Sequence, residues 1–174
     1  ILTNPPYVTS GSGSLKNALV DAGVSEEYSA SGRGTESLAL QWVVKSLKPG
    51  GQAFVVVPDG LLNQEGMLAY TKDRCIIRGV VSLPVRTFYS TPKKTYILAI
   101  ERKEDAIEQT DPVFFYLASE VGETRDANRW SIEPNDLPEM AGLFNQFAAT
   151  PTTFKSPSKR CKVVKWDVFG AYKH

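Results

Sequence analysis

The hydrophobic and polar positions along the chain alternate between strand-like and helix-like patterns. Residues 53–57 are continuously apolar, which is typical of a parallel strand buried on both faces. Upstream of this run, apolar residues recur with helical spacing at Leu38, Trp42, Val43 and Leu47. Pro49-Gly50-Gly51 ends that pattern. We therefore predict a helix over 36–47 with Thr35 as its N-cap, followed by a strand over 52–58.

The same patterns predict the other elements. Ile1-Leu2-Thr3 has the character of the end of a buried strand, whereas 8–35 is polar and glycine-rich and is expected to be a mobile loop around a short helix near 15–22. The further predicted elements are a helix over 64–76, strands over 79–83, 95–100 and 113–117, a helix over 136–148 and an edge strand over 163–168. This order predicts an α/β fold. The short connection between 83 and 95 favours an antiparallel pair there.

Composition narrows the class of protein. The 174 residues, 42% hydrophobic and 22% charged, fit a single globular domain. No apolar run approaches the roughly 18 residues of a membrane span, and no signal peptide is visible, so we expect a cytoplasmic protein. The only histidine is His174, and Cys75 and Cys161 lie far apart. This pattern argues against histidine-dependent triads, metal sites and a disulfide scaffold.

The formal net charge of +1 gives no nucleic-acid signal by itself. Five cations fall in one short stretch without acids: Lys155, Lys159, Arg160, Lys162 and Lys165. They form either a solvated face or a patch that contacts phosphates.

The motif that carries chemistry is Asn4-Pro5-Pro6-Tyr7, directly after a strand end. In doubly wound sheets, ligands bind beyond the carboxyl ends of the strands. Two prolines make this segment stiff, and neither has an N–H to donate. Asn4 Oδ1 and the Pro5 carbonyl are acceptors that suit an exocyclic amine, because they draw its hydrogens and stabilise the positive charge of its attack. Tyr7 suits stacking on a base turned out of the helix.

A different interpretation of the motif is a Pro-Pro turn or a polyproline ligand. The tyrosine directly follows the prolines, which is the wrong spacing for a Pro-Pro-x-Tyr ligand. The place of the motif after a strand therefore favours catalysis.

The motif and several further segments of the chain resemble a known family. Asn-Pro-Pro-Tyr is the catalytic motif of amino-methyltransferases that use S-adenosylmethionine. The segments 47–60, 80–84 with Phe88, and 94–98 are similar to the modification (M) subunits of type I restriction-modification systems. The resemblance covers roughly 1–103. It identifies the chain as the C-terminal part of the catalytic domain of an N6-adenine DNA methyltransferase.

The resemblance implies a fold, a cofactor and partners. The fold is the second half of a Rossmann-like S-adenosylmethionine-dependent methyltransferase sheet, with an antiparallel terminal strand. The implied partners are DNA, a specificity subunit and a restriction subunit. The family's glycine-rich cofactor motif lies upstream of the catalytic motif and is absent here, so only Asn4 and Pro5 are expected to touch the methyl end of S-adenosylmethionine.

Because the chain opens in the middle of a pattern, we expect it to be a fragment, inactive alone and prone to self-association through an uncovered apolar face or strand edge. We divide it into a catalytic half over 1–118 and a C-terminal extension over 119–174 that contacts DNA or a partner.

The further candidates for DNA contact lie on loops: Arg33, Arg86, Lys93 and Lys94. Lys93 and Lys94 also suit the start of a strand. Asp59, an acid at a strand end, is either catalytic or part of an Asp59-Gly60 turn, and the turn is favoured.

Alternative functions are methylation of ribosomal RNA or of a protein glutamine, and a non-catalytic nucleic-acid-binding module. The segments around Pro58-Asp59-Gly60 and Lys94-Thr95 favour DNA.

Overall fold

The computed structural model describes residues 1–6, 12–28, 34–61, 64–88 and 91–170. Its elements follow the order of an α/β protein. They are β1 (Leu2–Thr3), α1 (Ser12–Asp21), the 3₁₀ helix η1 (Ser25–Tyr28), α2 (Thr35–Ser46), β2 (Gln52–Pro58), α3 (Glu65–Arg74), β3 (Cys75–Ser82), β4 (Thr95–Arg102), β5 (Val113–Leu117), β6 (Val121–Glu123), β7 (Ser131–Asn135), α4 (Leu137–Ala149), β8 (Cys161–Val164) and α5 (Trp166–Gly170).

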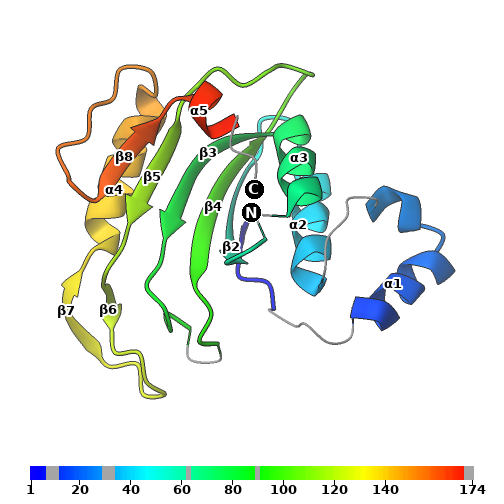
Figure 1. Ribbon diagram of the computed structural model, residues 1–174, viewed down its shortest axis with the longest axis horizontal. Helices are drawn as coiled ribbons and strands as arrows, with labels where there is room; N and C mark the ends of the chain where they lie inside the picture. The colour runs from blue at the N-terminus through cyan, green and yellow to red at the C-terminus, as the bar shows by residue number, and fades with distance from the viewer. Residues whose placement is uncertain (7–11, 29–33, 62–63, 89–90, 171–174) are drawn as a thin grey trace.

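Six strands form the main sheet in the order β1-β2-β4-β3-β5-β8. β1 is parallel to β2 and β3 is parallel to β5, whereas β4 is antiparallel to both of its neighbours and β8 is antiparallel to β5. The predicted antiparallel pair is thus confirmed as β3 and β4, with Ser82 opposite Tyr96. β4 inserts between β2 and β3, so the carboxyl ends of β1, β2 and β3 and the start of β4 share one edge, the carboxyl edge, at the bottom of Figure 1.

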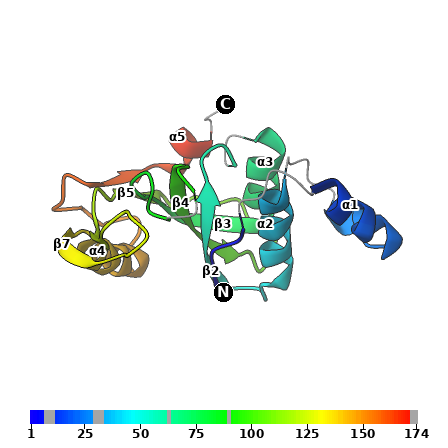
Figure 2. The same cartoon turned by 90° about the horizontal axis from the view of Figure 1, so that it is seen from below.

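Helices cover both faces of the sheet. α2 and α3 lie on one face and α4 on the other, as the view from below shows (Figure 2). The first face holds a core that includes Leu40, Val44, Val55, Val57 and Ile100, all at most 1% exposed. On the second face, α4 packs on the β5 side, where Phe114 and Phe147 are fully buried.

Burial of β2 differs from the prediction. Ala53, Val55 and Val57 are buried against α2 and α3, but Phe54 and Val56 on the other face are only half-buried. The reason is the position of α4, whose rings pack mainly on Phe114 and reach β2 only through the contact of Phe144 with Phe54, at 5.7 Å between ring centres.

The predicted start of α2 is corrected by one residue. Gly34 is the N-cap, with a φ of 114° that favours glycine, and Thr35 is the first helical residue. The Ser37 hydroxyl donates to the Gly34 carbonyl at 2.9 Å. Thr35 therefore does not hold the N-cap position that the sequence suggested.

Other boundaries also differ: β3 begins at Cys75, four residues before the predicted start, and takes over the end of the predicted helix. The helix predicted over 64–76 ends at Arg74, since Cys75 and Ile76 already pair with Arg102 and Glu101 in β4. The predicted edge strand over 163–168 is β8, which ends at Val164 and gives way to α5.

The polar regions also hold structure that the patterns missed. In 8–35, the short helix expected near 15–22 is confirmed as α1, whereas η1 was not predicted. The β6–β7 hairpin was not predicted, because all five residues of β7 are exposed and show no alternation of burial. Among the described residues, no helix is long and apolar enough to cross a membrane.

Candidate active site

The motif segment lies at the carboxyl edge of the sheet. Thr3 pairs with Val55, so three residues further on the chain reaches Pro6 while β2 reaches its last residue, Pro58. β1 and β2 therefore end at the same edge of the sheet. This is the edge at which α/β sheets place their ligands.

Asn4 and Pro6 are exposed at this edge, and Pro5 between them is buried. A buried proline fixes the backbone on both sides, because its ring restricts its own φ and the conformation of the residue before it. The segment therefore presents side-chain and main-chain oxygens from a stiff support. Such oxygens accept hydrogen bonds from an amine, and neither proline offers a competing N–H.

The turn after β2 brings an acid to the same edge. The Asp59 N–H donates to the Lys94 carbonyl at 2.8 Å, and the Leu61 N–H donates to the Pro58 carbonyl at 3.2 Å. Gly60 has a φ of 91°, a conformation that glycine adopts without strain. These contacts support the interpretation of Asp59-Gly60 as a turn.

The Asp59 side chain has a partner that the sequence did not reveal. The Tyr96 hydroxyl donates to Asp59 Oδ1 at 3.3 Å, and Lys94 Nζ lies 5.8 Å from the centre of the Tyr96 ring. Burial lowers the pKa of Lys94, whereas burial and the nearby Asp59 charge raise the pKa of Tyr96. Lys94 and Tyr96 are two positions apart, so they share one side of the strand, and this spacing is the signal that could have linked them.

The connection between β3 and β4 carries the other candidate cations. The Leu83 N–H donates to the Thr95 carbonyl at 3.0 Å, which ties the connection to the start of β4. Arg86 and Lys93 are both exposed on it. Arg86 has a φ of 60°, in the left-handed region that non-glycine residues rarely adopt. The structure therefore brings Lys94 close to Asp59, and holds Arg86 and Lys93 on an adjoining loop.

A buried carboxylate at the start of α2 was missed by the sequence analysis. Glu36 is 8% exposed, and among the described residues its Oε2 has no hydrogen-bond partner. The positive end of the α2 dipole favours a carboxylate in the first helical turn. α2 begins at the same end of the sheet where β1 finishes (Figure 1). The only sequence signal for Glu36 was an acidic residue in the first turn of a helix, which is a common pattern.

Two candidate residues cannot be placed relative to this site, and the basic stretch lies away from it. Tyr7 and Arg33 lie outside the described residues, so their stacking and DNA-contact roles remain sequence predictions. The basic stretch lies around β8, at the other end of the strand order from β1. Within it Arg160 is paired with Asp136 at 3.2 Å and donates to Ser119 Oγ at 2.7 Å. The stretch therefore does not extend the motif site.

Other chemistries find no support in the part of the chain that the structure describes. It contains no group of three metal-binding side chains. Both cysteines are buried and unpaired. Burial raises the pKa of the Cys75 thiol to about 11 and also raises that of Cys161, so neither suits a reactive thiolate.

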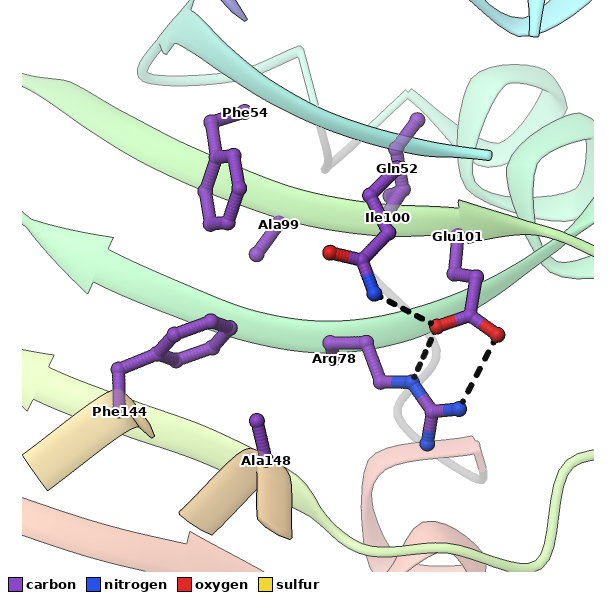
Figure 3. Close-up of a pocket in the computed structure, with 8 residues that line it drawn as sticks. All are labelled: Gln52, Phe54, Arg78, Ala99, Ile100, Glu101, Phe144 and Ala148. Atoms are coloured by element: carbon purple, nitrogen blue, oxygen red, sulfur yellow. Dashed lines mark hydrogen bonds and ion pairs between the residues drawn. The ribbon is translucent and has the colours of Figure 1, made fainter. Parts of the chain in front are cut away.

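A small cavity of about 80 Å³ lies at the opposite, amino edge of the sheet (Figure 3). The Gln52 amide and the Arg78 guanidinium both donate to Glu101 there, with Nε2 and Nε each 3.2 Å from Oε2. Phe54 and Phe144 close its other side. Its polar groups already bind one another, so this cavity is not a second site for the amine.

Comparison with known proteins identifies the family. The family model for N-6 DNA methylase matches residues 1–169. The methylase subunit of the type I restriction enzyme MpnII from Mycoplasma pneumoniae is 30% identical over 159 residues, which are 83% of this chain and 27% of that protein. The methylase subunit of EcoKI from Escherichia coli K12 is 26% identical over 102 residues, 56% of this chain and 18% of that protein. The chain thus spans about a quarter or less of the length of these relatives.

Solved structures share the fold at low identity. The type I restriction-modification methyltransferase subunit from Streptococcus thermophilus has a TM-score of 0.63 at 19% identity, covering 95% of this chain and 34% of that one. The type IIG restriction endonuclease BpuSI has a TM-score of 0.61 at 12% identity, covering 94% of this chain and 18% of that one. The family match over 1–169 includes the Asn-Pro-Pro segment, the turn after β2 and the β3–β4 connection. The chain therefore belongs to the N-6 DNA methylase family.

Proposed function

We propose that this chain forms the amine-activating part of a DNA methyltransferase that methylates N6 of adenine within a type I restriction-modification system. The observation that carries the proposal is the position of Asn4-Pro5-Pro6 at the carboxyl edge, next to the end of β2. Membership of the N-6 DNA methylase family supports it. The names of the relatives, type I methylase subunits, support the setting of restriction and modification.

Asn4 and Pro5 are the groups that act on the amine. The adenine nitrogen is a weak nucleophile because its lone pair is delocalised into the ring. Asn4 Oδ1 and the Pro5 carbonyl accept its two hydrogens, which favours tetrahedral geometry and stabilises the positive charge that develops on nitrogen. The methylated nitrogen then loses a proton to solvent. No general base is required before attack.

The described residues at this edge fit the methyl end of S-adenosylmethionine. They offer uncharged oxygens beside a stiff backbone, which suit an amine next to a sulfonium-bound methyl group. When bound, S-adenosylmethionine supplies the electrophilic methyl group. From this chain, Asn4 and Pro5 are the residues proposed to face it.

Neighbouring residues are proposed to hold the DNA. Lys94 has an ammonium group beside Asp59 and Tyr96, and Lys93 and Arg86 are exposed on the adjoining loop. Cations on loops at a ligand-binding edge suit phosphates. Tyr7 is proposed to stack on the adenine. A specificity subunit and a restriction subunit are the proposed protein partners.

The experiment is Asn4→Ala in the methyltransferase that contains this chain. Loss of one preorganised acceptor lowers the rate of adenine methylation about 10²–10³-fold. The thermal midpoint stays near wild type, because Asn4 is exposed and follows the last paired residue of β1. S-adenosylmethionine affinity changes far less than the rate, because Asn4 is proposed to face only the methyl end of the cofactor. Gln52→Ala, which changes an exposed amide at the other end of β2, is the matched control and retains activity.

Methylation at a near wild-type rate by the Asn4→Ala protein would contradict the proposal. Transfer by the wild-type protein to RNA or to a protein glutamine, with none to DNA, would replace the proposed substrate class.

A further inference from the structure

The β6–β7 hairpin reaches back to the loop after β3. Its tip and the β3–β4 connection project from the same end of the molecule (Figure 1). The Arg129 side chain links the two. Its Nη1 donates to the carbonyl oxygen of Thr87, 42 positions earlier in the chain, and its Nε donates to Glu123 Oε2 at 2.8 Å. Arg129 thus joins the hairpin to a loop at the carboxyl edge.

The hairpin tip is arranged so that Arg129 is held in place. Asp126 Oδ1 accepts from the N–H of Asn128 at 2.8 Å and from that of Arg129 at 3.3 Å. The Trp130 N–H donates to Thr124 Oγ1 at 2.9 Å, and its carbonyl accepts from the Thr124 N–H at 2.8 Å. Arg129 itself has a φ of 56°. A non-glycine residue keeps that conformation only when its surroundings fix it.

The loop that receives this contact needs an anchor. Thr87 is 6% exposed, and its hydroxyl donates to the Pro84 carbonyl at 2.6 Å. The residue before it, Arg86, adopts the unfavourable positive φ described above and is exposed. A cation held on a strained turn keeps one direction only while both sides of the turn are fixed. The contact of Arg129 with the Thr87 carbonyl fixes the side of the turn that follows Arg86.

The charge of the hairpin argues against direct binding of phosphates. Residues 120–135 carry four acids and two arginines, a net charge of −2. Both arginines already have acidic partners, Arg125 with Glu120 and Arg129 with Glu123. A surface with this balance repels a polyanion. Support of the neighbouring loop is therefore the role that fits the hairpin better.

We propose that Arg129 is a positioning residue, which holds the turn 84–88 so that Arg86 faces the DNA during methyl transfer. The expected effect on DNA methylation rests on the proposed function, whereas the anchoring of the turn 84–88 by Arg129 does not. Arg125 is the matched control. Its side chain is 32% exposed, against 31% for Arg129, and it also pairs with a glutamate and a carbonyl, but these belong to Glu120 and Ser119 on its own side of the molecule and not to the described residues of the turn 84–88.

The first readout is amide hydrogen exchange of the methyltransferase that contains this chain. Arg129→Ala speeds exchange at Leu83 and Thr87 about tenfold or more, since opening of a weakened loop sets their exchange rate. Arg125→Ala leaves those rates unchanged, and Arg129→Lys, which keeps one donor, restores part of the protection. Equal exchange profiles for Arg129→Ala and Arg125→Ala would overturn the proposed anchor.

The second readout is the kinetics of methylation. Arg129→Ala raises KM for DNA several-fold, with kcat and S-adenosylmethionine affinity changed less than twofold, whereas a general loss of structure lowers kcat as well. An unchanged KM for DNA alongside a loosened loop would overturn the positioning role. A wild-type protein that methylates no DNA would contradict the proposed function, and the exchange comparison would still decide the anchor.

Discussion

The two edges of the main sheet use polar residues in opposite ways. At the amino edge, Arg78 lies between Glu101 and Asp111, with Nε 3.2 Å from Glu101 Oε2 and Nη1 2.7 Å from Asp111 Oδ2. At the carboxyl edge, the side chains of Asn4 and Arg86 are exposed. Polar side chains therefore stabilise the fold at one edge and remain accessible for binding at the other.

Gln109 shows how a side chain can replace a missing backbone partner at the amino edge. Its Oε1 accepts from the Ile77 N–H at 2.8 Å, and its Nε2 donates to the Ile77 carbonyl at 2.9 Å. Continuing the β3–β5 register back by two residues brings Ile77 opposite Pro112, which has no N–H to donate. The side-chain amide therefore completes the strand ladder where proline interrupts it. Gln109 therefore has a structural role at this edge.

The largest effect on stability is expected for Gln109→Ala. Gln109 is 5% exposed, and its removal leaves the N–H and carbonyl of Ile77 buried without partners. Each such group costs about 1–3 kcal/mol, so unfolding should become easier by about 2–4 kcal/mol. Urea denaturation measures the change, and Gln146→Ala, an exposed glutamine on α4, is the control. Equal stability of the two variants would remove the contrast between the edges.

A smaller loss is expected for Arg78→Ala. Its side chain is 22% exposed and those of Glu101 and Asp111 are 20% and 35% exposed, so screening by water reduces the value of these ion pairs. We expect a loss of about 1–2 kcal/mol in the same denaturation experiment, with the methylation rate of the folded protein unchanged.

The exposed pair of Arg74 with Asp73 supplies the control for Arg78. Asp73→Ala removes a pair in which Asp73 is 71% exposed, and should change stability by less than about 0.5 kcal/mol. If Arg78→Ala instead reduced methylation without reducing stability, the amino edge would have to be assigned a functional role.

A smaller loss of stability than for Arg78→Ala is expected at the carboxyl edge, for Tyr96→Phe. The hydroxyl contact with Asp59 is long and exposed, so its loss should cost less than about 1 kcal/mol. The folded-state pKa of Tyr96 is raised, so the folded state favours the neutral hydroxyl. That contribution is fully present below the unfolded value near 10 and is lost as pH rises through the raised pKa. The stability difference between wild type and Tyr96→Phe should therefore shrink above pH ~10. A stability difference that grows with pH would contradict the raised pKa of Tyr96 in the folded state.

The accuracy of the predicted bounds varied among the strands: β3 begins at Cys75 rather than at 79, and β8 covers Cys161–Val164 rather than 163–168. β2 over 52–58 and β5 over 113–117 were placed correctly, because each is a compact apolar run between polar breaks. The end of α3 was wrong, since Cys75 and Ile76 pair with β4, and that partner lies far away in sequence. The β6–β7 hairpin was missed because its residues bury little and leave no periodic pattern.

The candidate site also combines features that the sequence predicted with contacts that it did not predict. The acceptor chemistry proposed for Asn4-Pro5-Pro6 was predicted from residue types and from the place of the segment after a strand, and in the structure the segment lies at the carboxyl edge. The link between Asp59 and Tyr96 and that between Arg129 and Thr87 could not, because each joins positions 37 or more apart. Side-chain contacts over such distances depend on the packing of whole elements.

The sequence by itself determined the α/β class, the antiparallel pair after β3 and the family resemblance, which the N-6 DNA methylase match confirms. These features depend on short patterns: apolar runs, turn residues and one tetrapeptide. The tertiary structure alone decided which polar groups are satisfied. Gln109 and Arg129 are ordinary residues in polar segments, and each acquires its role from a backbone carbonyl that folding brings within hydrogen-bond distance. Local sequence patterns indicate which polar or apolar groups a residue carries, whereas tertiary packing determines which partners those groups contact.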